Sequence, residues 1–101
     1  MKIKNWQLLN SLRSKECFPQ CNEWSLADWG NAMAVETGEA CNIIKKMSRD
    51  SVDLKEELGK ELADIVAYVA LLANAANIDL EKAMIDKFDE VSIKLGSNYR
   101  A

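Results

Sequence analysis

The chain has 101 residues, of which 49% are hydrophobic and 29% charged, which is the size and balance of one compact domain. Its formal net charge of -3, with 16 acidic against 13 basic residues, argues against a protein that binds nucleic acid through a basic face. No apolar run approaches the roughly 18 residues of a membrane span, and the N-terminus lacks the apolar region of a signal peptide. We therefore expect a single cytoplasmic domain over residues 1–101, without nucleic-acid or membrane partners.

The composition favours helices over sheet, because the chain has one proline, four glycines and few clusters of β-branched residues. The predicted fold class is all-α, a bundle of four to five helices. Cys17, Cys21 and Cys41 form an odd set in a chain without export signals, which favours free thiols over disulfides. A zinc site built from them would lack its usual fourth ligand, because the chain contains no histidine.

The first predicted helix covers residues 4–16, where apolar residues recur at helical spacing. Pro19 and Asn22 then interrupt the pattern. Residues 17–24 are therefore expected to form a connecting loop, which is unusually rich in aromatic residues and cysteine. The apolar residues of the helix are Trp6, Leu8, Leu9 and Leu12.

The second predicted helix begins after Ser25, a favourable N-cap residue that is followed three positions later by Asp28 in the manner of a capping box. It extends to about Met47. At 100° per residue, Glu36 falls inside the apolar stripe of this helix and Glu39 lies on its edge, so an acid occupies a core position that needs an explanation. The stripe consists of Leu26, Trp29, Met33, Ala40, Ile44 and Met47.

The third predicted helix begins at Asp53, where a glutamate three residues later repeats the capping pattern, and ends near Ala76. Glu61 lies beside its apolar stripe, while Asp64 and Tyr68 share the adjoining flank. Acidic residues therefore border the buried side of this helix as well. The stripe consists of Leu54, Leu58, Leu62, Ile65, Val69 and Leu72.

Asn77 is expected to stop the third helix, and Asp79 to cap a fourth helix that ends at Gly96. A short, mostly polar tail follows. Residues at helical spacing along the fourth helix are Leu80, Ala83, Met84, Lys87, Phe88, Val91 and Leu95.

The four acids form two pairs, Glu36 with Glu39 and Glu61 with Asp64, and each pair is spaced by three residues. Residues three apart share one face of a helix, so antiparallel packing of the two helices would bring all four carboxylates together. Any one of them could simply be solvated. Together, in a half-buried site, they would repel one another unless a cation lay between them.

Ligands that are all carboxylate oxygens favour Mg²⁺ or Mn²⁺, and the absence of histidine excludes a di-iron helical bundle. Mg²⁺ held by acids with open water positions is typical of enzymes that handle phosphates. The chain has no Walker-type phosphate loop, so basic side chains such as Lys87 would have to help the metal hold a phosphate.

The motifs Glu36-x-x-Glu39 and Glu61-x-x-Asp64, followed by Tyr68 and a lysine at position 87, resemble those of the MazG-like nucleoside triphosphate pyrophosphohydrolases. These belong to the all-α NTP pyrophosphatase superfamily. The resemblance is to the small single-domain forms found in bacteria and phages, and it covers roughly residues 18–95. The paired motif with its downstream lysine is fairly specific, whereas either half alone is weak.

The resemblance implies hydrolysis of a (deoxy)nucleoside triphosphate to the monophosphate and pyrophosphate, with a house-cleaning role in the nucleotide pool. It also implies a homodimer or homotetramer. By this analogy the four acids bind Mg²⁺, with Glu39 or Glu36 also acting on the attacking water, and Lys87 contacts the phosphates. Tyr68 would contact the sugar or base. The expected base-binding aromatic residues are Phe18, Trp24 and Trp29, of which Trp29 also lies in the core stripe.

The chain departs from the family pattern after Lys87, where an asparagine and one or more arginines are expected on the next turn. Lys94 or Arg100, from the same or another subunit, would have to replace them. This departure keeps a second hypothesis open, a non-catalytic helical interaction module on the same scaffold. A third is an acid-lined bundle that stores or senses metal without nucleotide.

Overall fold

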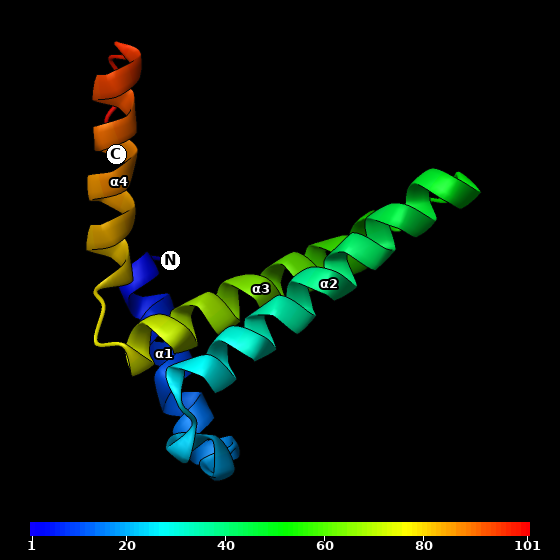
Figure 1. Cartoon of the computed structure of the whole chain (residues 1–101), viewed down its shortest axis with the longest axis horizontal. Helices are drawn as coiled ribbons and strands as arrows, with labels where there is room; N and C mark the ends of the chain where they lie inside the picture. The colour runs from blue at the N-terminus through cyan, green and yellow to red at the C-terminus, as the bar shows by residue number, and fades with distance from the viewer.

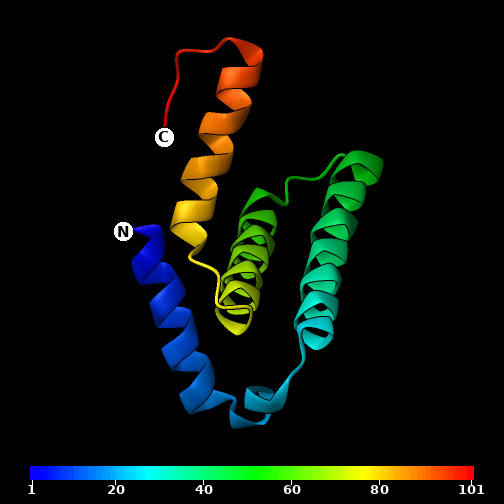
Figure 2. The same cartoon turned by 60° about the vertical axis from the view of Figure 1, so that its left-hand side comes forward.

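The computed structural model describes residues 1–101 and contains only helices, so the all-α prediction is confirmed. Helices α2 and α3 lie side by side as an antiparallel hairpin, α1 packs against α3, and α4 stands apart from the hairpin (Figures 1 and 2). The elements are α1 (Ile3–Cys17), the 3-10 helix η1 (Pro19–Glu23), α2 (Leu26–Asp50), α3 (Lys55–Ala75) and α4 (Leu80–Leu95).

Local sequence signals account for the start of α2 and for both ends of α4. The Ser25 hydroxyl accepts a hydrogen bond from the Asp28 backbone N–H at 3.2 Å, and the Asp28 carboxylate accepts one from the Ser25 backbone N–H at 2.9 Å, which completes the predicted capping box. Asp79 caps α4 through the backbone N–H of Lys82. Gly96 ends α4 in the left-handed region, with φ of 68°.

The predicted start of α3 is wrong by one residue. Leu54, not Asp53, is its N-cap residue. The Asp53 carboxylate instead accepts a hydrogen bond from the backbone N–H of Lys55 at 3.0 Å, a short turn that leads into the helix. Asn77 adopts φ of 56° directly after α3, as expected of a residue that stops a helix.

The core is small and lies around α3, the helix that contacts both α2 and α1. Trp29 is its one large member, and the other fully buried apolar residues are Ala40, Ala70 and Ala73. The short side chains of these alanines allow the helix backbones to approach closely. This arrangement positions the hairpin face that carries the acidic residues.

The buried face of α1 is not the face that carries its leucines. Leu8, Leu9 and Leu12 are exposed, whereas α1 buries Asn10 and Ser14. The reason is tertiary, because side-chain amides join α1 to the end of α3 and set its rotation. The Gln7 side-chain amide donates to the side-chain oxygen of Asn74 at 2.9 Å and to the carbonyl of Ile78 at 2.7 Å. The Asn74 side-chain amide donates to the Gln7 backbone carbonyl. The Leu80 backbone N–H donates to the Gln7 side-chain oxygen.

The predicted apolar stripes of α2 and α3 are only partly buried. Leu26 and Ile44 of α2 and Leu62 of α3 are exposed, because the two-helix contact is narrower than the apolar stripes. Met33 and Met47 of α2 remain partly covered, as do the other stripe positions of α3.

The apolar face of α4 has no partner within the chain. Its groove of about 700 Å³ is lined by Met84, Phe88, Val91 and Leu95 together with Tyr99 of the tail. Leu95 and Tyr99 are 77% and 78% exposed. The radius of gyration is 16.1 Å, whereas a compact chain of about 100 residues has about 13 Å. One copy of the chain is therefore an open structure.

No single helix is both long and apolar enough to cross a membrane, although α3 and α4 together meet that test of length and composition across a bend of 106°.

Candidate metal centre and adjoining cavity

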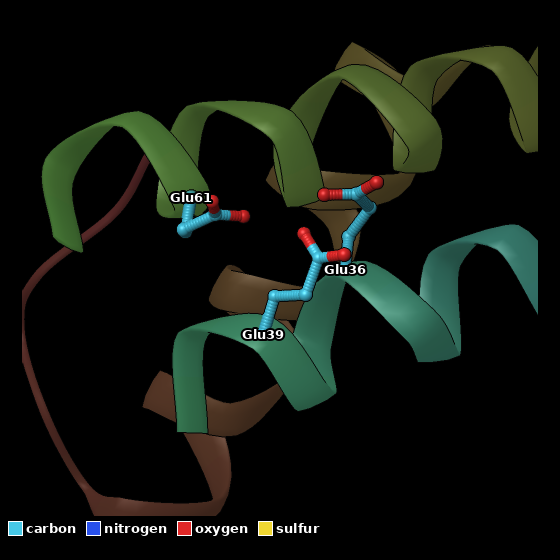
Figure 3. A group of neighbouring side chains, drawn as sticks. All are labelled: Glu36, Glu39 and Glu61. Atoms are coloured by element: carbon cyan, nitrogen blue, oxygen red, sulfur yellow. The ribbon is translucent and has the colours of Figure 1, made fainter. Parts of the chain in front are cut away.

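Three carboxylates from two helices converge between α2 and α3. Glu36 and Glu39 project from α2 and Glu61 from α3 into the space between the helices (Figure 3). One oxygen from each lies within 4.8 Å of the others. Two oxygens on opposite sides of a hard cation are about 4–5 Å apart, given bonds of roughly 2.0–2.6 Å. The spacing therefore fits ligands of one divalent ion.

The antiparallel hairpin explains why these acids meet. Glu36 follows Trp29 at a spacing of seven and precedes buried Ala40 at a spacing of four, so it lies on the face that α2 turns towards α3. Glu61 holds the equivalent position on α3 between partly covered Leu58 and Ile65. Both glutamates are half-buried, as predicted, and Glu39 is exposed at the rim.

The carboxylates of the cluster lack a compensating positive charge. Burial raises the pKa of Glu36, and the negative charges of Glu39 and Asp64 raise it further. Burial also raises the pKa of Glu61, and the nearby carboxylates of Glu39 and Asp64 raise it further. None of the ion pairs in the chain involves these acids.

One oxygen of the cluster has no hydrogen-bond partner at all. The Oε2 atom of Glu61 is buried and receives no hydrogen bond from the protein. A buried, unsatisfied carboxylate oxygen is costly, and a cation would satisfy it. The donor set, the spacing and this orphaned oxygen therefore fit a hard divalent ion such as Mg²⁺.

Asp64 stands slightly apart from the three convergent glutamates. Its charge raises the pKa of both Glu36 and Glu61, but it is exposed and is not part of the group whose oxygens meet. Instead it lies at the edge of a neighbouring cavity. The structure thus brings three of the four predicted acids to one point and places the fourth between that point and the cavity.

The cavity beside Asp64 has a volume of about 250 Å³ and is lined by every aromatic residue predicted to contact the substrate. The ring centroids of Trp24 and Trp29 are 4.6 Å apart, and those of Trp29 and Tyr68 are 6.4 Å apart. Trp29, at 7% exposed, belongs both to the core and to the cavity wall. Phe18 is half exposed at the cavity wall.

Tyr68 links the cavity to the acids. Burial raises the pKa of its phenol, and the negative charge of Glu36 raises it further. The phenol therefore stays protonated at neutral pH and can donate a hydrogen bond beside the acid cluster.

Six other residues line the same cavity and do not figure among the predicted site residues. Asn10, Arg13 and Ser14 come from α1, Cys21 from η1, and Ala67 and Leu71 from α3. A signal for two of them exists in the sequence, because Asn10 and Ser14 follow Trp6 at spacings of four and eight and so share its helix face. The neighbouring leucines conceal this signal, since they suggest a different buried face. All three cysteines are free, as predicted.

The two lysines predicted to contact phosphate lie on α4, away from the acids. Lys87 and Lys94 pair with the carboxylate of Glu90 at 3.4 and 3.3 Å. Helix α4 does not pack on the hairpin (Figure 2). Arg100 donates hydrogen bonds to the carbonyls of Ser97 and Tyr99 in the tail. Within one chain, these cations are therefore not assembled with the acid cluster.

The fold and the site together define an all-helical protein with an acid-rich site between two antiparallel helices. The family model described as the MazG nucleotide pyrophosphohydrolase domain matches residues 27–97. The chain belongs to this family, whose activity is the pyrophosphohydrolysis of nucleotides. The matched residues include α3, α4, nearly all of α2 and all four acids, whereas α1 and η1 precede them. No curated protein and no solved structure shows a significant match to the chain.

Proposed function

We propose that this protein is a Mg²⁺-dependent hydrolase that converts a (deoxy)nucleoside triphosphate to the monophosphate and pyrophosphate, as a single domain acting on the cytoplasmic nucleotide pool. The observation that carries the proposal is the convergence of Glu36, Glu39 and Glu61, without a neutralising cation, beside an aromatic cavity. The family match supports the reaction class.

The roles of the acids follow from their positions. Glu36, Glu39 and Glu61 would hold Mg²⁺, with Mn²⁺ as a substitute, and Asp64 would complete the set from the cavity side. A bound divalent ion supplies charge for the phosphate oxygens and lowers the pKa of a coordinated water. Glu39, the exposed member of the cluster, is best placed to orient or deprotonate the attacking water, and half-buried Glu36 is the alternative.

The aromatic cavity would hold the nucleoside. Phe18, Trp24 and Trp29 offer ring faces on which a base can stack. Tyr68 lies between these rings and the acids, so its protonated phenol is suited to bond the sugar or base. The acids, Tyr68 and the aromatic rings therefore follow one another as the phosphates, sugar and base do in a nucleotide.

We further propose that the enzyme is a homodimer or homotetramer whose neighbouring subunits complete the site. The apolar groove of α4 is uncovered in one chain, and the radius of gyration of 16.1 Å exceeds that of a compact chain of this length. Lys87 and Lys94 flank this region of α4. Association along α4 would allow these lysines to contact the triphosphate bound by another subunit.

The direct test is to incubate the purified protein with each dNTP and Mg²⁺ and to measure monophosphate and pyrophosphate. We expect both products in equal amounts and no turnover after metal removal with EDTA. No release from any common or modified nucleotide would contradict the proposal. Calorimetric titration with Mg²⁺ and a non-hydrolysable nucleotide would then identify a non-catalytic module, which binds neither, or a metal-storage protein, which binds only the ion.

A further inference from the structure

Helix α1 contributes two buried polar side chains to the aromatic cavity. Asn10 is 4% exposed and Ser14 is 9% exposed, and both line the cavity that adjoins Asp64 and Tyr68. Both precede residue 27, where the family match begins. These two side chains therefore lie outside the matched residues, whereas the four acids lie within them.

The hydrogen bonds of Asn10 fix its orientation. Its side-chain Nδ2 donates to the carbonyl of Trp6 at 2.9 Å, one turn earlier in α1. This bond orients the amide and leaves its Oδ1 as an acceptor to which no protein group donates. The atom is not sealed inside the protein, so it remains available to a molecule in the cavity.

The hydroxyl of Ser14 is also unused. Its backbone carbonyl accepts a hydrogen bond from the Phe18 N–H at 2.9 Å, but its side chain bonds to no protein atom. A hydroxyl can donate or accept. Asn10 and Ser14 are one helical turn apart on one face, so the cavity wall presents an acceptor beside a donor.

Aromatic rings also line the cavity. Trp24 and Trp29 line this cavity and, with Ser14, Cys21 and Leu71, also a second cavity of about 240 Å³, so these residues lie between the two. The volume of about 250 Å³ lies below the roughly 300–1,000 Å³ typical of pockets for drug-sized ligands. A single-ring base suits this space better than a double ring, because the sugar must also fit near Tyr68.

We propose that Asn10 and Ser14 recognise the edge of the base and that, together with the small volume of the cavity, they favour a pyrimidine nucleoside triphosphate. Asn10 Oδ1 accepts a hydrogen bond from an N–H group on the base edge. The Ser14 hydroxyl donates to the adjacent ring nitrogen or carbonyl. This inference rests on the proposed function, and it adds the base class and the residues that recognise it.

The test measures kcat/KM for dCTP, dUTP, dTTP, dATP and dGTP, and for a deoxyribose triphosphate that lacks a base. The wild-type protein should prefer one or more pyrimidines. Asn10→Ala and Ser14→Ala should each lower kcat/KM for the preferred pyrimidine by roughly tenfold, the value of one hydrogen bond, and leave the base-free substrate unchanged. Asn5→Ala, an exposed change on α1, is the matched control and should alter neither.

Three results would overturn the inference. The first is a wild-type preference for purines. The second is a loss of kcat/KM in the variants that is equally large on the base-free substrate, and the third is a preference among bases that neither variant changes. Circular dichroism melting shows whether Asn10→Ala has merely loosened α1, and Ser14→Thr, which retains a hydroxyl, should keep the pyrimidine preference.

A binding measurement separates this inference from the proposed hydrolysis. Quenching of tryptophan fluorescence by dCMP, dUMP and dTMP needs no turnover. Tighter binding of a pyrimidine monophosphate than of dAMP or dGMP, weakened by Asn10→Ala, would support base selection even if no triphosphate is hydrolysed. Equal binding of all five by wild-type and variant protein would contradict it, even in an active enzyme.

Discussion

The α2–α3 hairpin and helix α4 have comparable apolar periodicity but different surroundings. In the hairpin, the apolar stripes of two antiparallel helices meet, and Glu36 and Glu61 are half-buried between them (Figure 3). In α4, the stripe that contains Phe88 and Leu95 faces an open groove. Helical periodicity therefore shows which residues share a face, whereas the covering of that face depends on a partner element.

The charges of the two regions differ in the same way. Glu36, Glu39, Glu61 and Asp64 of the hairpin form no ion pair. Lys87 and Lys94 of α4 pair with Glu90, in ion pairs exposed to solvent that contribute little to stability. The hairpin thus holds an uncompensated half-buried charge, and α4 holds cations that can exchange partners easily. The acids lack a cation, which a bound metal ion or the lysines of α4 can supply.

The largest expected effect is the loss of a ligand in the hairpin. Glu61→Gln removes a charge from the acid cluster, and we expect kcat/KM for the preferred triphosphate to fall at least about 100-fold, because a displaced metal misaligns water and phosphate. Pyrophosphate release measures this. Glu57→Gln on the exposed first turn of α3 is the matched control and should retain activity. Full activity of Glu61→Gln in a folded protein would show that the metal site lies elsewhere.

The next effect concerns the open face of α4. Phe88→Glu places a charge in the apolar groove, and we expect the dissociation constant of the oligomer to rise by roughly 100-fold, since each copy loses a buried aromatic side chain. Light scattering with size-exclusion chromatography measures the mass. Ile93→Glu changes another exposed residue of α4 that does not line the groove, and it should leave the mass unaltered. A monomeric wild-type protein would contradict the proposed assembly.

A third effect is the linkage of stability to metal and pH in the hairpin. Because the pKa of Glu36 is raised in the folded state, the folded protein binds its proton more tightly than the unfolded chain does. The metal-free protein should therefore lose stability as pH rises through the range between the unfolded and folded pKa values. Mg²⁺ at 100 times its dissociation constant should restore about 2.7 kcal/mol at neutral pH.

Thermal unfolding with EDTA or Mg²⁺ measures this linkage. Glu36→Gln removes the titrating group, so it should raise the melting temperature of the metal-free protein at pH 7 and reduce the gain from Mg²⁺. A wild-type protein whose melting temperature is insensitive to Mg²⁺ would contradict a metal centre between α2 and α3.

The smallest effect tests the local signal that starts α2. Ser25→Ala removes the side-chain half of the capping box, and we expect the free energy of unfolding to fall by about 1 kcal/mol. Urea denaturation followed by circular dichroism measures it. Ser48→Ala, near the exposed end of the same helix, should be neutral or slightly stabilising because alanine favours the helix interior. Equal effects of the two substitutions would argue against the cap.

Part of the site was predictable from the sequence, because the relevant chemistry is local. The pairs at a spacing of three place each set of acids on one helix face, and the absence of histidine restricts the ligands to oxygen. The convergence of Glu36, Glu39 and Glu61 then required only that α2 and α3 pack antiparallel, which a short connection favours. The position of Asp64 outside this group depends on helix rotation by a fraction of a turn, which spacing does not resolve.

The sequence by itself determined the start of α2, the end of α3 and both ends of α4, through Ser25, Asn77, Asp79 and Gly96, because capping depends on neighbouring backbone groups. Only the tertiary structure decided which face of α1 is buried. Gln7 bonds to the end of α3 and turns Asn10 and Ser14 inward while the leucines remain exposed. The tertiary structure also left the apolar groove of α4 uncovered. Periodicity describes one helix, whereas burial requires two surfaces to meet.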